Sequence, residues 1–281
     1  MTTRTHSNEL PRETHIGRTA LRVRDLDEMM GFYRDVVGLG ILSQSDDATI
    51  LGVADTPLLI LEESEDALER HSSSAGLFHN AFRVPSREAL GDALVRIREH
   101  WQLGGAADHD VSEALYLTDP EGNGIEIYRD YPRDEWPYSD DGTVHMGTYA
   151  LDLEPIAAAA TGDPNLPDGT DVGHVHLEVS SLEEFRDFYV DLIGFEAQIT
   201  VPAALFVSAS GYHHHLGANT WSRRSKPASG RGISWFEIVV PDTAVLTEIQ
   251  ARIEDSEYPV FETEDGISVI GPDEIEVRLR A

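Results

Sequence analysis

The chain has 281 residues, which is enough for two domains of ordinary size, each able to bury its own core. Its 51 aspartates and glutamates against 21 lysines and arginines give a formal charge of -30, and a negative coat of this kind repels nucleic acid and anionic lipid. The absence of cysteine excludes disulfides and thiolate chemistry, and no run approaches the roughly 20 apolar residues that a membrane span needs.

The acidic residues are spread along the whole chain, and Lys226 is the only lysine. This balance resembles that of cytoplasmic proteins from extreme halophiles, in which high salt screens the repulsion between like charges. The alternative is an acidic partner-binding protein, which the even spread of the acid disfavours. The first residues, MTTRTHSNEL, have no apolar signal core, so we expect a cytoplasmic protein.

The first predicted elements, in residues 17–39, recur 156 positions later in residues 173–195 without a gap. The same shift carries residues 79–99 onto residues 235–255, and a weaker shift of 61 carries the first segment onto the second. Self-similarity of this kind indicates repeated structural units. We therefore predict four modules that start near residues 15, 78, 172 and 233.

Each module begins with an alternating segment typical of a half-buried strand, such as ALRV or HLEV. A helix N-cap follows at Arg24-Asp25 or Ser180-Ser181, and then an amphipathic helix that ends at Gly38 or Gly194, where a left-handed C-cap is favoured. Short strands such as PLLILEE, ALYLTD, GIEIYRD, ALFVSA and EIEVRLRA come next. The order is βαβββ, and the fold class is α+β.

Residues 131–170 are rich in Pro, Gly and Asp and are predicted to be a linker, with one strand from Met146 to Leu153. This divides the chain into an N-terminal domain of two modules (residues 1–130), the linker (residues 131–170) and a C-terminal domain of two modules (residues 171–281). No feature of the sequence decides whether the chain forms a homo-oligomer.

Several of these segments resemble the vicinal-oxygen-chelate superfamily of glyoxalases, bleomycin-resistance proteins and extradiol dioxygenases. The resemblance rests on the four-module layout and on DPEGNGIEIY at residues 119–128. SEALYLTDPEGNGIEIY (residues 112–128) and GYHHHLGANTW (residues 211–221) are similar to the catechol-2,3-dioxygenase branch. The resemblance implies that modules pair into two cups of strands, which hold a divalent metal and a substrate with two adjacent oxygens.

In extradiol members, the resemblance implies iron(II) bound by a histidine in the first strand of each of two modules and by a glutamate in a last strand. The corresponding positions in the C-terminal half are His174, Trp235 and Glu276. The histidine strand at residues 213–215 offers a replacement for the missing ligand, and its match to the relatives favours His214 pointing inward. We therefore expect a metal held by His174, His214 and Glu276, with Fe(II) preferred and Mn(II) or Zn(II) also suited to these ligand types.

In the N-terminal half the corresponding positions are Arg18, His79 and Glu126. The Arg18 guanidinium would pair with Glu126 and fill the cup, which leaves open whether His79 and Glu126 form a second site. Trp235 would instead wall the pocket and stack on an aromatic ring.

The resemblance implies a metal-dependent extradiol dioxygenase that cleaves a small aromatic diol with dioxygen, with His215 or His176 handling protons. The alternatives are a glyoxalase-type metal-dependent isomerase or lyase, and a metal-free protein that binds aromatic compounds. A basic segment, residues 221–232, would either attract an anionic substrate or pair with the acidic coat.

Overall fold

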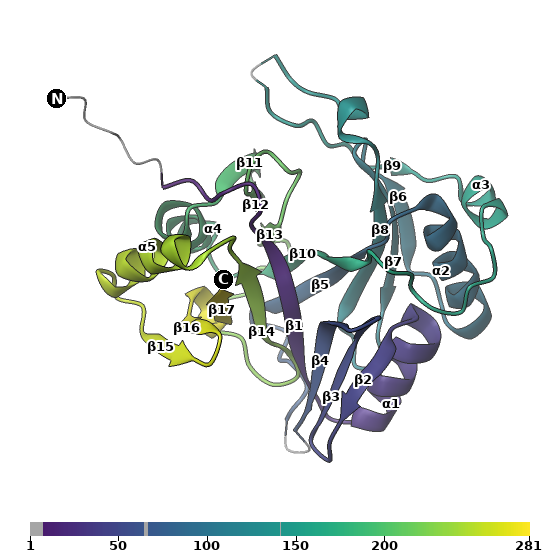
Figure 1. Cartoon of the computed structure of the whole chain (residues 1–281), viewed down its shortest axis with the longest axis horizontal. Coiled ribbons are helices and arrows are strands. Elements are labelled where there is room, and N and C mark those ends of the chain that lie inside the picture. The colour runs from purple at the N-terminus through teal and green to yellow at the C-terminus, as the bar shows by residue number, and fades with distance from the viewer. Residues whose placement is uncertain (1–7, 65–66, 141) are drawn as a thin grey trace.

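The computed structural model describes residues 8–64, 67–140 and 142–281 of the chain. Of the first ten residues, where we expect no signal core, residues 1–7 lie outside the described part of the chain and only Asn8 to Leu10 are described. The described strands form one sheet of eight and one sheet of nine, and the helices lie on the outer sides of the two sheets (Figure 1). No helix in the described part of the chain is long and apolar enough to cross a membrane.

The four predicted modules are confirmed in the order βαβββ. Module 1 contains β1 (His15–Val23), α1 (Leu26–Phe32) with a wider π turn (Tyr33–Val37), β2 (Gly40–Gln44), β3 (Ala48–Val53) and β4 (Thr56–Glu63). Module 2 contains β5 (Gly76–Arg83), α2 (Arg87–His100), β6 (Gly105–Asp108), β7 (Ser112–Thr118) and β8 (Gly124–Asp130).

The C-terminal half repeats this order. Module 3 contains β10 (Asp171–Glu178), α4 (Leu182–Arg186) with a π turn (Asp187–Ile193), β11 (Glu196–Val201), β12 (Ala204–Ser208) and β13 (Leu216–Asn219). Module 4 contains β14 (Gly232–Val239), α5 (Thr243–Glu254), β15 (Val260–Thr263), β16 (Gly266–Ile270), a 3-10 turn (Pro272–Glu274) and β17 (Glu276–Arg280).

The predicted helix ends are confirmed. The side chain of Asp25 accepts a hydrogen bond from the Glu28 N–H, and that of Ser181 accepts one from the Glu184 N–H, so both act as N-caps. Gly38 and Gly194 have φ values of 94° and 111°, a left-handed conformation that glycine adopts without a steric penalty.

The linker contains more structure than the sequence indicates. The strand expected from Met146 to Leu153 is reduced to β9 (Tyr149–Ala150), which pairs with β6, and helix α3 (Leu153–Ala158) follows it. A 3-10 turn (Arg133–Glu135) lies at the start of the linker. Ile156 of α3 is buried in the main core, so the linker packs against module 2 through α3 and α2.

The modules pair across the linker, which corrects the division into an N-terminal and a C-terminal domain. β1 pairs antiparallel with β14, which joins module 1 to module 4, and β5 pairs antiparallel with β10, which joins module 2 to module 3. The last strand of each module pairs with one edge of that module's first strand. The other edge of the first strand is free to pair with the first strand of another module. The repeat therefore fixes the modules but does not fix their partners.

The two sheets lie against each other along their central strands β1 and β10 (Figure 1). The amide of buried Asn80 on β5 donates a hydrogen bond of 2.8 Å to the hydroxyl of buried Thr19 on β1. One continuous hydrophobic cluster runs through both halves of the chain. The two cups are thus parts of one folded unit.

Candidate metal centre

The cup of modules 2 and 3 brings together two histidines and one glutamate on its inner face. His79 lies on β5, Glu126 on β8 and His174 on β10, and all three are buried. His79 Nε2 lies 3.0 Å from Glu126 Oε2, and His174 Nε2 lies 3.1 Å from both of these atoms. The three ligand-type atoms therefore converge on one point from three neighbouring strands.

These separations fit a single divalent cation. Ligand atoms about 2.1 Å from an ion, and at right angles to one another, lie about 3 Å apart, and two histidines with one carboxylate on one face are typical of non-haem iron(II) sites. The Glu126 carboxyl group is in the ionised form that binds such an ion. Burial alone would raise the pKa of Glu126, but the charge and hydrogen bonds of His174 and His79 outweigh it and hold this pKa well below its usual range. Burial lowers the pKa of His174 to about 4, so its ring is neutral at pH 7.

Gly173, next to His174, sets the position of this ligand. In the β5–β10 ladder Val172 is opposite Phe82 and His174 is opposite Ala81, so Gly173 is an extra, bulged residue. A Cβ atom at Gly173 would lie 1.8 Å from the hydroxyl oxygen of Tyr128. Only glycine allows the buried Tyr128 to pack this closely beside the ligand.

One of the proposed ligands, Glu276, is placed differently from the expectation. Glu276 lies on β17 in the other sheet, where it accepts hydrogen bonds from Ser268 Oγ (2.8 Å) and Arg278 Nε (2.7 Å). The structure therefore does not bring Glu276 to His174. His214 does face the pocket, with its ring centroid 4.0 Å from that of His174, and it lies beside the three-residue cluster.

The expectation for Arg18 also needs correction. Arg18 pairs with Glu237 of module 4 and not with Glu126: its Nε lies 2.9 Å from both carboxylate oxygens of Glu237. In the same cup Trp235 donates a hydrogen bond of 2.9 Å to Glu62, and the Arg278 guanidinium lies 3.8 Å from the centroid of the Trp235 ring. Ion pairs and a cation–π contact thus engage the residues of modules 1 and 4 at the positions that correspond to ligands.

A cavity of about 490 Å³ opens beside the three ligand-type residues. Its polar wall includes His109, Tyr116, His176, His213 and His214. His109 Nδ1 donates to the Gly147 carbonyl (2.8 Å), which can only accept, so in the neutral ring Nε2 accepts from the Tyr116 hydroxyl (2.7 Å). Burial and the nearby Glu126 raise the pKa of Tyr116 well above its usual value, so the hydroxyl stays protonated.

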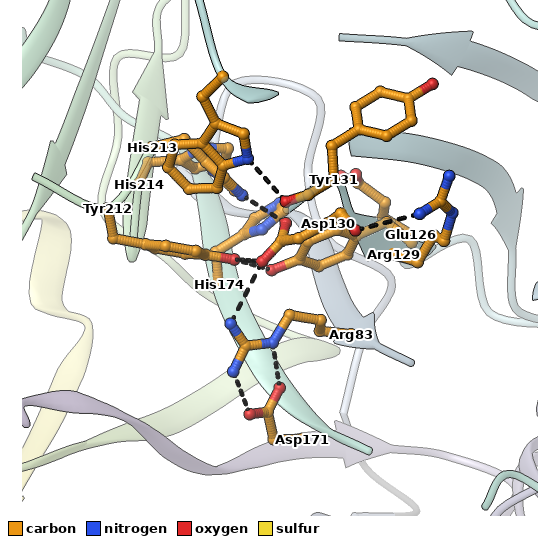
Figure 2. Close-up of polar contacts among 12 residues, drawn as sticks. Arg83, Glu126, Arg129, Asp130, Tyr131, Asp171, His174, Tyr212, His213 and His214 are labelled. Carbon is orange, nitrogen blue, oxygen red and sulfur yellow. Dashed lines mark hydrogen bonds and ion pairs between the residues drawn. The ribbon is translucent and has the colours of Figure 1, made fainter. Parts of the chain in front are cut away.

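Residues 213–215, expected in a strand, form an irregular segment just before β13, and a second chain of hydrogen bonds fixes this segment behind the pocket (Figure 2). His213 Nε2 donates to Asp130 Oδ1 (3.0 Å), and His213 Nδ1 lies 2.7 Å from His214 Nδ1. Burial alone would raise the pKa of Asp130, but His213 and Arg83 outweigh it and keep this carboxyl ionised. With neutral rings, His214 Nδ1 then donates to His213 Nδ1, which leaves His214 Nε2 able to accept a proton.

Of the two histidines expected to handle protons, only His176 lines the pocket. Its Nε2 accepts a hydrogen bond of 3.1 Å from the Asn219 amide. His215 lies outside this pocket, and its Nδ1 accepts from the Ala209 N–H (3.1 Å). The sequence does not predict Tyr116, His109 or Asp130 as site residues. Only Tyr116 has a sequence signal: side chains alternate between the two faces of β7 and β8, and Tyr116 lies opposite Glu126.

Two of the four cations in the basic segment pair with acidic residues. Arg224 Nη2 lies 2.6 Å from Glu178, and Arg231 Nη1 lies 3.4 Å from Glu121. Neither arginine lines the pocket, nor do Arg223 and Lys226.

The sequence of this chain is also similar to those of known proteins. Residues 15–127 match the model of the glyoxalase/bleomycin resistance protein/dioxygenase superfamily. The chain is 41% identical to catechol-2,3-dioxygenase of Bacillus subtilis (strain 168) over 270 residues, which cover 92% of this chain and 94% of that protein. It is 24% identical to biphenyl-2,3-diol 1,2-dioxygenase 3 of Rhodococcus globerulus over 56% of this chain and 85% of that protein.

The fold is also found in solved structures. A Bacillus subtilis protein described as a dioxygenase superposes with a TM-score of 0.67 at 15% identity, covering 95% of this chain and 84% of that chain. At this identity the likeness concerns the fold alone.

Proposed function

Because the chain belongs to the glyoxalase/bleomycin resistance protein/dioxygenase superfamily, we propose that it is a metal-dependent extradiol dioxygenase that acts on a catechol-like diol. The observation that carries the proposal is the convergence of His79 Nε2, Glu126 Oε2 and His174 Nε2 at 3.0–3.1 Å from one another. The 41% identity to a catechol-2,3-dioxygenase over most of both chains supports it.

His79, Glu126 and His174 would hold the ion, with Fe(II) preferred and Mn(II) or Zn(II) as the alternatives. An ion held by these residues would supply Lewis-acid activation of the diol and a site for dioxygen. The ring bond beside the diol breaks, and both atoms of dioxygen enter the ring-opened product, so no external reductant is needed.

The protein's own side chains prepare the diol for this step. His214 Nε2 is the nitrogen that can take a proton from a diol hydroxyl and return it later, because Asp130 and His213 fix its tautomer. The Tyr116 hydroxyl donates to His109, so its oxygen remains able to accept a hydrogen bond from the other diol hydroxyl. His176 stands beside His79, with ring centroids 4.9 Å apart, and limits the space next to the ion.

Oxygen uptake after anaerobic loading with Fe(II), Mn(II) or Zn(II) tests the proposal. We expect one metal to restore catechol-dependent uptake with one dioxygen consumed per ring opened. Metal-dependent turnover of a hemithioacetal without oxygen uptake would instead identify a glyoxalase-type isomerase. Binding of catechol without metal and without turnover would identify a binding protein.

A further inference from the structure

The outer wall of the pocket is apolar although it is open to solvent. Phe78, Val201 and Trp221 line the cavity with exposed fractions of 37%, 45% and 54%. Large hydrophobic side chains exposed together around a cavity usually mark a binding surface. They lie on β5, on the edge strand β11 and just after β13, so they surround the entrance from modules 2 and 3.

A bulge in β5 turns Phe78 toward this wall. In the β5–β10 ladder His79 is opposite His176 and Leu77 is opposite Leu177, so Phe78 has no partner on β10. Successive residues of a regular strand point to opposite faces, yet both Phe78 and His79 line the pocket. A bulge beside a site commonly redirects one side chain in this way.

Aromatic contacts connect the entrance with the ligand-type residues. The Phe78 ring centroid lies 5.3 Å from those of both His79 and Trp221 and 4.9 Å from that of His176. Phe206 continues the wall, 5.4 Å from His176. A flat apolar group on the substrate would find edges and faces of rings along this path.

The same wall offers no positive charge. No lysine or arginine is among the described residues that line the cavity. The nearby arginines Arg70 and Arg224 both pair with Glu178, at 2.9 Å and 2.6 Å. A carboxylate carried by the substrate would lose part of its hydration against this apolar wall and would meet no lysine or arginine there, in a protein whose formal charge is -30.

We infer that the substrate is a catechol with an uncharged apolar substituent, which packs against Phe78, Val201 and Trp221, and that catechols with a carboxylate are excluded. This inference rests on the proposed function and adds the substrate class. The cavity of about 490 Å³ falls in the range of roughly 300–1,000 Å³ typical of sites for ligands larger than a single small ring.

A matched pair of substrates tests the charge. 4-Ethylcatechol and 3,4-dihydroxyphenylacetate differ by a methyl group in place of a carboxylate. With the metal-loaded enzyme we expect kcat/KM from oxygen uptake to be at least about 100-fold higher for 4-ethylcatechol. Val201→Arg supplies a cation at the exposed entrance and should narrow this ratio at least about tenfold.

Trp221→Ala tests the apolar contact. It should lower kcat/KM for 4-phenylcatechol about tenfold and that for catechol less than about threefold. Phe261→Ala is the control, because Phe261 is 53% exposed on β15 of the other sheet. Equal efficiency with the two substituted substrates, or an equal loss for 4-phenylcatechol and catechol in Trp221→Ala, would overturn the inference.

A wrong dioxygenase assignment would give a different result from a wrong substrate class. If no catechol consumes oxygen, the dioxygenase assignment is wrong. Anaerobic calorimetric titration with 4-ethylcatechol and 3,4-dihydroxyphenylacetate then still decides the pocket's preference: tighter binding of 4-ethylcatechol supports it, and equal or reversed affinities refute it.

Discussion

His79 and His174 are separated by the whole linker in the sequence, yet their Nε2 atoms lie 3.1 Å apart. The pairing of β5 with β10 accounts for this proximity, because it places the first strands of modules 2 and 3 side by side. The cup that contains these two histidines is therefore shared by both halves of the chain. The other cup, built from modules 1 and 4, has Arg18 and Trp235 at the corresponding positions.

Substitutions of the candidate ligands should show which of the two cups binds the metal. Glu126→Gln and His79→Ala should each reduce bound metal to a small fraction of the wild-type content and abolish turnover, because each removes one of three ligands. Glu276→Gln is the matched control and should retain both, since Glu276 is hydrogen-bonded in the other sheet. Metal analysis of the purified variants decides this. If Glu276→Gln alone lost its metal, the site would belong to the cup of modules 1 and 4.

The modules could be predicted from the sequence, but the partners of the modules could not. Strand and helix periodicity, the caps at Asp25 and Ser181 and the glycines at 38 and 194 are local signals, and all agree with the structure. Pairing of first strands is a long-range property, and four similar strands allow several pairings. The position of His174 could be predicted from the repeat, whereas its partners Glu126 and His79 depend on the pairing.

Gly173→Ala should disturb the fold and the metal site together. The new Cβ would lie 1.8 Å from the Tyr128 hydroxyl oxygen, so the bulge that positions His174 must shift. We expect the free energy of unfolding to fall by about 2–3 kcal/mol, as in other overpacked cores, with weaker metal binding. Gly105→Ala on β6 of the same sheet is the control, because its Cβ would have no atom within 4 Å. Urea unfolding and metal titration measure both effects, and equal stability of the two variants would contradict the prediction.

Arg18→Met should destabilise the protein without emptying the metal site. Glu237 is buried and would keep the backbone N–H of position 18 (2.9 Å) and, as its cation, Arg280, whose Nε lies 3.4 Å from its carboxylate. Removing one partner of a buried ion pair lowers the free energy of unfolding by about 3 kcal/mol, whereas replacing both partners with apolar residues often leaves it unchanged. The double variant Arg18→Met/Glu237→Leu should therefore recover most of the loss in a denaturant titration. A loss of bound metal in Arg18→Met would show that the second cup takes part in the site.

High salt should raise the melting temperature. The formal charge of -30 implies strong repulsion within the folded chain, and 1 M salt shortens the screening length to about 3 Å. Calorimetry in KCl from low to molar concentration measures the effect, with sucrose of equal osmolality as the control for general stabilisation. A melting temperature that does not change with KCl would argue against adaptation to salt.

His215 should make the protein sensitive to acid. Its ring is buried, and burial, followed by nearby positive groups, lowers its pKa to about 3. In the unfolded chain a histidine titrates near pH 6.5, so the unfolded chain takes up this proton first. The stability contributed by neutral His215 is therefore fully present above about pH 6.5 and is lost as the pH falls toward 3.

His215→Asn isolates this contribution, because the asparagine oxygen can still accept the hydrogen bond from the Ala209 N–H. Between pH 7 and pH 5, the free energy of unfolding should fall by about 2 kcal/mol less in this variant than in the wild type. Urea unfolding at the two pH values measures the difference, with substitution of His100, an exposed residue at the end of α2, as the control. If His215→Asn loses as much stability on acidification as the wild type, the acid sensitivity arises from other groups, and the buried ring of His215 does not set it.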